Sequence, residues 1–575
     1  MVYDAPLLKR NLKRLLLLLA PAALMAGWVC WNRTPTADMS AYVPAESLAF
    51  AEAGDLVALA NGITGTEAWR VLAPSLGAPA ELLPHSWSIK LARWTGIGSA
   101  EAVLVARSQV GIFFTQAQAT ESANTLTIKP LAALVIETHT SQRRMRPVVD
   151  YHVEQFARRS FGETTVTRKQ VDGIEFVEWK TPDNARRLIL ATIDSVAIIG
   201  NDESVVLSCI EVRRGRRPSL ATNQQMQTMK QQVGAAQAPL FAFVPRAGVK
   251  AVIYAWALDR AGDVSQPEAI AALISNAFGN LIEAFAWTSR FDSSGAEDRC
   301  RVALVEGVGR QLGDDLTPEP LRDKLDLSFV PADAVSVTSY HLRNPASFWR
   351  QLNAVVSSRA DVLTAVATRP LLRGLLEPYG INDPDSFFSA TGSRIQVVRF
   401  DDSPQAVLIA PMFDKAGLRK LAEQRLGRQP KAEKLHETEI LVGSDGWSFA
   451  FAGDHFLSGR TQEVTRCLEA KTRGQSITTK ASLNRAREKL DVSLSILSLS
   501  FTQDSPAAIS FVELFSAHER SAFSTNAAEI SRGAESLPYS VSVTLMKGDA
   551  AEWSSRSSFG LLGSLFTIFA PDRVQ

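Results

Sequence analysis

A short motif occurs twice in this chain of 575 residues and divides the sequence into two similar parts. Tyr42–Glu46 reads YVPAE, and Phe329–Asp333 reads FVPAD. After each motif, matching elements are predicted in the same order, up to a final hairpin that includes Phe291 in the first part and Leu545 in the second. The spacing between matched positions decreases steadily along the chain. That decrease requires only deletions in the second part, whereas chance matches would scatter, so the pattern predicts a tandem repeat of one domain.

Each predicted repeat is an α+β domain with a mainly antiparallel sheet packed with helices. Its strands occur mostly as hairpins rather than as β-α-β units, which favours antiparallel pairing with helices on one face. We place the repeat domains at residues 41–306 and 327–575, with a linker at residues 307–326 that is rich in Gly, Asp and Pro. The predicted fold class is therefore two tandem homologous domains behind an N-terminal transmembrane helix.

That helix is predicted from a basic segment followed by an apolar run, Leu15–Trp31. A run of this length spans about 26 Å as a helix, which is the short end of a membrane crossing. The basic flank predicts a cytoplasmic segment at residues 1–14, a transmembrane anchor at 15–31 and a linker at 32–40. We expect a single-pass protein of the bacterial inner membrane with its bulk in the periplasm. A cleaved signal peptide is the alternative, although Ala20–Ala22 fits a cleavage site poorly and Ala26–Gly27 is the other position for a cut.

The composition excludes several functional classes. A net charge of +1 gives no overall field that would attract nucleic acid. Beyond the predicted anchor the chain has only Cys209, Cys300 and Cys467, too few for a fold that depends on disulfides. Cys209 and Cys467 occupy matching positions in the two repeats. They could meet across a pseudo-twofold axis, but two buried free thiols are the more common arrangement.

We predict no catalytic residue, no cofactor and no metal site. The seven histidines include no pair spaced as metal ligands on one helix face. Gly443–Gly446 has the wrong spacing for a nucleophile elbow and fits a hairpin turn. Gly307–Gly313 follows a predicted strand, but acidic residues follow it where a dinucleotide-binding loop would open a helix.

Two further segments could contact a partner. Four arginines follow the predicted helix that holds Cys209, where cations match the dipole of a helix C-terminus. The functional alternative is a contact with anionic lipid head groups or with an acidic envelope protein. The four arginines are Arg213, Arg214, Arg216 and Arg217.

The apolar C-terminal run at residues 559–570 is too short for an ordinary membrane crossing, so we expect a buried terminal helix, with docking onto a membrane or partner as the alternative.

The start of each repeat resembles a family of uncharacterised bacterial membrane-anchored envelope proteins. Domains of that family begin Leu-Pro-Ala-Asp and have a tryptophan helix after the first strand, as the second repeat has at Pro345–Trp349. Valine replaces the leucine in both repeats, and Glu46 replaces the aspartate in the first. The resemblance covers only the start of each repeat, and it implies a location and a fold but no activity.

These observations favour a non-enzymatic scaffold or binding protein of the cell envelope. The alternative is a carrier or sensor of an apolar ligand, such as a lipid, held between sheet and helices. A hydrolase whose active site assembles from dispersed residues is a third hypothesis.

Overall fold

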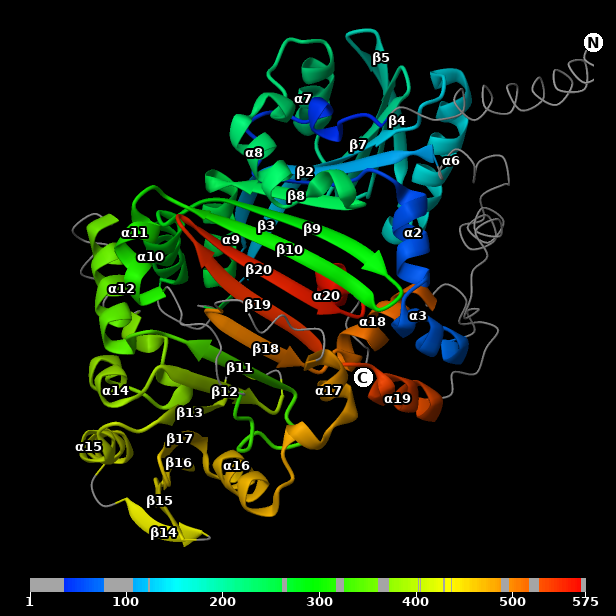
Figure 1. The fold of residues 1–575 in the computed structure, drawn as a ribbon. Helices are drawn as coiled ribbons and strands as arrows, with labels where there is room; N and C mark the ends of the chain where they lie inside the picture. The colour runs from blue at the N-terminus through cyan, green and yellow to red at the C-terminus, as the bar shows by residue number, and fades with distance from the viewer. Residues whose placement is uncertain are drawn as a thin grey trace, which may run out of the picture.

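In the computed structural model, strands from both repeats form one sheet of 20 strands, and all neighbouring strands are antiparallel (Figure 1). The described part up to residue 316 is called the first half, and the part from residue 325 the second half. The structure describes residues 36–76, 107–122, 125–260, 266–316, 325–359, 372–401, 403, 405–427, 430–435, 437–487, 496–516 and 527–569.

The first half contributes ten strands, and along the sequence most of its helices lie between these strands. Its strands are β1 (Ala49–Ala53), β2 (Gln109–Ser122), β3 (Thr125–Glu137), β4 (Thr165–Val171), β5 (Ile174–Lys180), β6 (Arg187–Ile193), β7 (Val196–Gly200), β8 (Leu240–Pro245), β9 (Ile282–Asp292) and β10 (Gly295–Leu304). Its helices are η1 (Met39–Tyr42), α2 (Leu56–Thr64), α3 (Glu67–Leu72), η2 (Pro74–Leu76), α6 (Gln142–Phe161), α7 (Glu203–Arg213), η4 (Leu220–Thr222), α8 (Gln224–Gln232), η5 (Ala235–Gln237), α9 (Arg246–Arg260), α10 (Pro267–Gly279) and α11 (Val308–Leu316).

The second half contributes ten further strands in the same sequence order. Its strands are β11 (Ser336–His341), β12 (Arg394–Arg399), β13 (Val407–Pro411), β14 (Lys431–Leu435), β15 (Thr438–Val442), β16 (Trp447–Ala452), β17 (His455–Arg460), β18 (Ser498–Thr502), β19 (Ser540–Lys547) and β20 (Ala550–Ser557). Its helices are α12 (Pro345–Arg359), η6 (Glu377–Tyr379), α14 (Pro384–Ala390), α15 (Lys415–Leu426), α16 (Thr461–Arg473), η7 (Ile477–Thr479), α17 (Ala481–Arg487), α18 (Ser505–Ser516), α19 (Ala527–Ser536) and α20 (Gly560–Phe569).

The two halves have the same topology. Every strand pairing described in the first half recurs in the second when each strand number is raised by ten. Across the sheet the order is β4-β5-β6-β7-β3-β2-β1-β8-β9-β10, continuing β20-β19-β18-β11-β12-β13-β17-β16-β15-β14. The strand order is therefore symmetrical about the β10–β20 pair. Figure 1 shows β4 near one end of the molecule and β14 at the opposite end.

The β10–β20 pair lies on a pseudo-twofold axis. Arg299 is the fifth residue of β10, Ser554 is the fifth residue of β20, and these two residues are register partners. Because antiparallel strands that pair at equivalent positions are related by a twofold rotation, the axis passes between Arg299 and Ser554. Figure 1 shows the hairpins β9–β10 and β19–β20 side by side at the centre of the sheet.

The repeated motif makes the same contacts in both halves. In the first half, the carbonyl oxygen of Val43 accepts a hydrogen bond from the backbone N–H of Leu220 at 2.7 Å. In the second half, the carbonyl oxygen of Val330 accepts one from the backbone N–H of Ile477 at 2.8 Å. The motif thus fixes the start of each half against the short helix η4 or η7, which explains why it recurs with so little change.

Helices beside the central pair are exchanged between the halves. Helix α3 of the first half packs against α18 and α19 of the second, and α12 of the second half packs against α10 and α11 of the first. Figure 1 shows these two helix groups at opposite ends of the central strands. The tryptophans of the repeated Trp-Arg pair, Trp69 and Trp349, are buried in the two groups. Each half therefore completes part of its core with side chains of the other.

These contacts overturn the predicted fold class of two tandem domains with a sheet each. The α+β composition and the antiparallel pairing agree with the prediction, but the sheet is continuous through both halves. The physical reason is that β10 and β20 would otherwise each be an open sheet edge with unpaired backbone groups, and pairing them satisfies both edges. Residues 308–316, which the sequence placed in a linker, form helix α11 and pack on α12.

The predicted location in a membrane is also corrected. Among the described residues, no helix combines the length and the apolar character that a membrane span requires. The longest of them, α6, carries charged residues along its whole length. The predicted cytoplasmic segment at residues 1–14 and anchor at residues 15–31 lie outside the described residues. The described residues thus give no support to the predicted single-pass location in the inner membrane.

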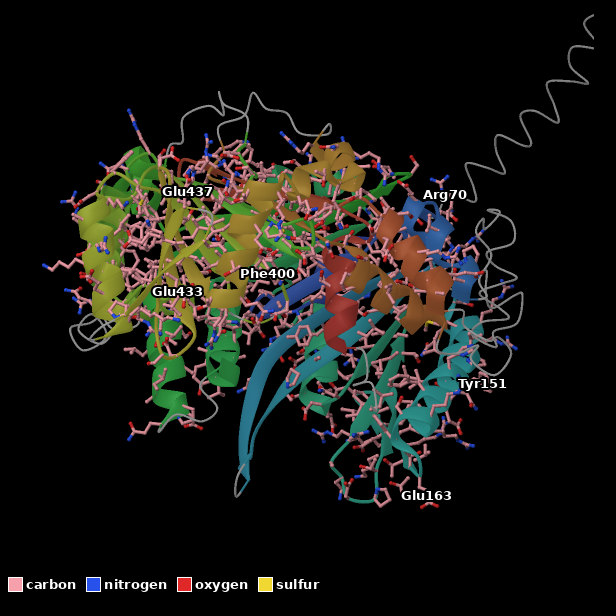
Figure 2. All side chains as sticks on the ribbon, turned by 90° about the horizontal axis from the view of Figure 1, so that it is seen from below. Arg70, Tyr151, Glu163, Phe400, Glu433 and Glu437 are labelled. Carbon is pink, nitrogen blue, oxygen red and sulfur yellow. The ribbon has the colours of Figure 1, made fainter. Side chains whose placement is uncertain are left out.

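The hairpin of β2 and β3 is much longer than its counterpart. It contains strands of 14 and 13 residues, whereas β12 and β13 have 6 and 5. Pairing with β1 ends at Phe114 and pairing with β7 ends at Ala133, so the outer part of the hairpin pairs only with itself. Figure 2 shows this part as an arm that projects from the body of the molecule.

Candidate functional site

A network of polar side chains, buried or partly buried except for the exposed Asp38, lies where β1 and β3 end and β2 begins. Strands β1, β2 and β3 supply its floor, and the segment around η1 covers it. Gln109, the first residue of β2, is the register partner of Glu137, the last residue of β3, so both side chains lie on one face. We call this network the polar belt, and its members are Asp38, Tyr42, Glu52, Gln109, Glu137, His139 and Lys230.

Glu137 is at the centre of the polar belt. It is 4 % exposed, and one carboxylate oxygen accepts a hydrogen bond from the Tyr42 hydroxyl at 2.7 Å. The other oxygen accepts from the backbone N–H of His139 at 2.8 Å. Burial and the neighbouring carboxylate of Glu137 raise the pKa of Tyr42, because both disfavour a phenolate. Tyr42 is therefore held as a hydrogen-bond donor to Glu137.

His139 occupies an unusual backbone conformation. Its φ is +51°, in the left-handed region that costs about 1 kcal/mol or more for a residue with a Cβ. Its Nε2 lies 2.9 Å from Oε1 of Gln109, and that same oxygen accepts a hydrogen bond from the backbone N–H of Ala37 at 2.7 Å. The strained turn thus places the imidazole where Gln109 joins it to the chain segment above.

Lys230 closes the other end of the polar belt. Its ammonium nitrogen lies 2.5 Å from a carboxylate oxygen of Glu52 and 3.3 Å from one of Asp38. Burial alone would lower the pKa of Lys230, but the two carboxylates outweigh that effect and hold the pKa above its usual value. The amine therefore stays charged, and it fixes Asp38 and η1 over β1.

The second half has apolar residues at several equivalent positions. Phe329 precedes the Val-Pro motif there, as Tyr42 does in the first half. Pro411 pairs with the first residue of β17, as Glu137 pairs with the first residue of β7. Phe413, two residues after Pro411, replaces His139. Its φ is not positive, so the left-handed conformation of His139 does not recur there. Since the second half forms the same topology without these polar groups, the fold does not require them, and the polar belt is the candidate functional site.

The polar belt offers acid, base and hydrogen-bonding groups that are already paired with one another. Its chemistry suits either the binding of the segment at residues 36–42 or the recognition of a polar group next to that segment. Within the described ranges, no group of three or more His, Cys, Asp or Glu side chains is arranged to hold a metal ion. The three cysteines of the described chain, Cys209, Cys300 and Cys467, are buried free thiols.

The predicted arginine cluster forms ion pairs inside the chain. Its four members contact carboxylates of nearby turns and of the repeated motif, so the cluster connects α7 to the hairpins β4–β5 and β6–β7. Contact with an acidic partner or with lipid head groups stays a prediction for these residues. The pairs are Arg213–Asp194 at 3.4 Å, Arg214–Asp172 and Arg216–Asp172 at 3.2 Å, Arg217–Glu211 at 3.7 Å, and Arg217–Glu46.

A second candidate surface lies on the pseudo-twofold axis. We call it the central face, and it is one side of the β10–β20 pair. Its members are Glu297, Arg299 and Arg301 of β10 with Glu552, Ser554 and Arg556 of β20. The axis relates Glu297 to Glu552 and Arg301 to Arg556, and the ion pairs Glu297–Arg556 and Arg301–Glu552 are equivalent across it. This surface has no distinctive signal in the sequence, because single charged residues in strands are common.

His341, at the end of β11, gives a prediction about acid stability. Its Nε2 is buried without a hydrogen-bond partner among the described residues. Burial, together with the positive charge of Arg394, lowers its pKa to about 4 from 6.5. The unfolded chain therefore binds a proton below pH 6.5 that the folded chain does not bind until about pH 4. The effect of His341 on the free energy of unfolding is therefore absent above pH 6.5. As the pH decreases from 6.5 to about 4, its titration lowers the stability of the folded chain.

We expect His341→Gln to remove part of this loss. The difference in unfolding free energy between pH 7.5 and pH 4.5 should shrink by about 2 kcal/mol, allowing for the solvent that still reaches part of the ring. Urea unfolding of both proteins at the two pH values measures the difference. His455→Gln, at a turn where His455 contacts the exposed Asp454, is the matched control. An unchanged pH dependence in the His341 variant would contradict the prediction.

No protein-family model, no curated protein and no solved structure matches this chain. The resemblance of the motif to envelope proteins stays a prediction. The function is therefore inferred from the geometry of the two candidate surfaces.

Proposed function

We propose that this chain is a non-enzymatic scaffold or binding protein. The observation that carries the proposal is the joining of two equivalent halves into one continuous sheet, with helices exchanged on both sides of the axis. This construction presents the central face and the two outer ends of the sheet in fixed relative positions. A framework of this kind suits the binding of a partner at more than one point.

The state of the polar belt supports binding over catalysis. A general acid must direct its proton, and a general base its lone pair, toward a substrate position. In the polar belt, the Tyr42 hydroxyl donates a hydrogen bond to Glu137, and the imidazole of His139 contacts Gln109. The raised pKa of Tyr42 also makes its phenolate unavailable near neutral pH. These groups act on one another and on the covering segment.

Two measurements on the purified full chain test the proposal. We expect no turnover of chromogenic ester, phosphoester, glycoside or peptide substrates above that of a Glu137→Gln variant. We also expect cross-linking in cells to capture a protein that, once purified, co-elutes with the full chain in a fixed ratio. Turnover that Glu137→Gln abolishes would replace the proposal with a hydrolase function. Failure to reconstitute any captured complex from purified components would count equally against it.

A further inference from the structure

The central face has more cations than carboxylates. Glu297 contacts Arg299 at 2.7 Å and Arg556 at 3.4 Å, and Arg556 also contacts Asp292, the last residue of β9, at 3.2 Å. Glu552 contacts Arg301 and, at 2.5 Å, Lys547. Each carboxylate is thus shared by two cations. An arginine or lysine side chain has more N–H donors than a shared carboxylate can accept from. The cations of the central face therefore retain donors that can bind further anions.

The accessible part of this face is narrow. On one side, the α8–η5 junction covers β9, where the Thr288 hydroxyl donates to the carbonyl oxygen of Val233 at 3.0 Å. On the other side, Val541 of β19 is buried in a cluster with Leu483 of α17. Between them, the side chain of Arg299 is exposed by 51 %, that of Arg556 by 36 % and that of Arg301 by 19 %. The exposed strip is therefore about two strands, or roughly 10 Å, wide, which suits an extended chain lying along the strands better than a helix with its side chains.

The cations follow the repeat of an extended chain. Arg556, Arg299 and Arg301 occupy three successive rows of the β10–β20 ladder, because they pair in register with Glu297, Ser554 and Glu552. Rows of side chains on one face of a strand are about 6.8 Å apart. In an extended peptide, residues at alternate positions have the same spacing and point to the same side. Carboxylates at every second residue would therefore meet one cation in each row.

We propose that the central face binds an extended segment of a partner protein in which acidic residues occupy alternate positions. The inference rests on the proposed function, since it names the chemistry of the partner that the scaffold would bind. The pseudo-twofold axis gives the face similar cations on both sides of Arg299. The segment can therefore bind in either direction along the strip.

The test is fluorescence anisotropy of the full chain with a labelled peptide of alternating aspartate and serine. A peptide of the same composition with its aspartates in one block is the comparison. We expect the alternating peptide to bind more tightly, and added salt to weaken it. Arg299→Ser, which copies the residue at the equivalent position of β20, should weaken binding about fivefold. Arg310→Ser removes an exposed arginine of α11 from outside the face and should leave binding unchanged.

The outcomes separate this proposal from the broader one. Equal binding of both peptides would show attraction to any polyanion and overturn the proposal. So would equal affinities of the Arg299 and Arg310 variants, or tighter binding of a single-stranded oligonucleotide. Equal urea midpoints of both variants and the unaltered chain exclude misfolding. A reconstituted partner that binds Arg299→Ser normally would overturn this inference while leaving the scaffold function intact.

Discussion

Replacing Phe511 with alanine should lower the free energy of unfolding by about 3–5 kcal/mol. Phe511 of α18 is fully buried, and its ring stacks on Phe559 with 4.4 Å between the ring centroids. The same cluster contains Trp69 and Leu72 of α3, which belong to the other half. The cavity would therefore weaken the contact between the halves as well as the core of one half. Urea unfolding followed by circular dichroism measures the change.

The matched control for Phe511 is Phe413→Ala. Phe413 is 79 % exposed, so its truncation should change stability by less than about 0.5 kcal/mol. A further expectation is that both halves of the Phe511 variant lose structure together, because each contributes to the damaged cluster. A variant with the stability of the Phe413 control would show that the exchanged helices contribute little to the fold.

Removing the central carboxylate of the polar belt should lower the free energy of unfolding almost as much as Phe511→Ala does. We expect Glu137→Ala to destabilise the chain by about 3 kcal/mol. The reason is that the Tyr42 hydroxyl and the backbone N–H of His139 both lose their acceptor in a buried site. The covering segment should loosen with it, and hydrogen exchange of residues 36–42 would detect that loosening.

Tyr42→Phe is the control for this prediction, because phenylalanine is the residue that the second half has at the equivalent position. It removes the donor rather than the acceptor and should cost about 1 kcal/mol. The double variant should be less destabilised than the sum of the two single variants, since Tyr42 no longer needs Glu137. Strict additivity would mean that the hydroxyl and the carboxylate contribute independently.

The repeated order of elements was accessible from the sequence, because each match depends on local signals. The Val-Pro motif makes equivalent contacts in both halves, and helices α6 and α15 both end at glycines with positive φ, Gly162 and Gly427. Hairpin turns and helix ends are specified by a few neighbouring residues. Such features carry over from sequence to structure even where overall similarity is low.

The continuous sheet was not accessible, because nothing local in β10 or β20 specifies a partner strand. Alternation of buried and exposed residues, such as Asp298 and Arg299, fits an edge strand as well as a central one. The polar belt was missed for a different reason. Glu137 and Gln109 are single polar residues at strand ends, where polar residues are expected. Only a position-by-position comparison of the two repeats, setting Tyr42 against Phe329 and Glu137 against Pro411, could have identified the belt.

The pairing of β10 with β20 at equivalent positions has a consequence for the origin of the chain. Two identical copies of one half could associate through the same register, as a symmetric homodimer. Fusing the copies makes this association intramolecular, so that it no longer depends on protein concentration. A homodimer from one gene must carry the same side chains on both subunits. The fused chain is free of that constraint, and it can keep Glu137 and His139 on one side of the axis while Pro411 and Phe413 occupy the other.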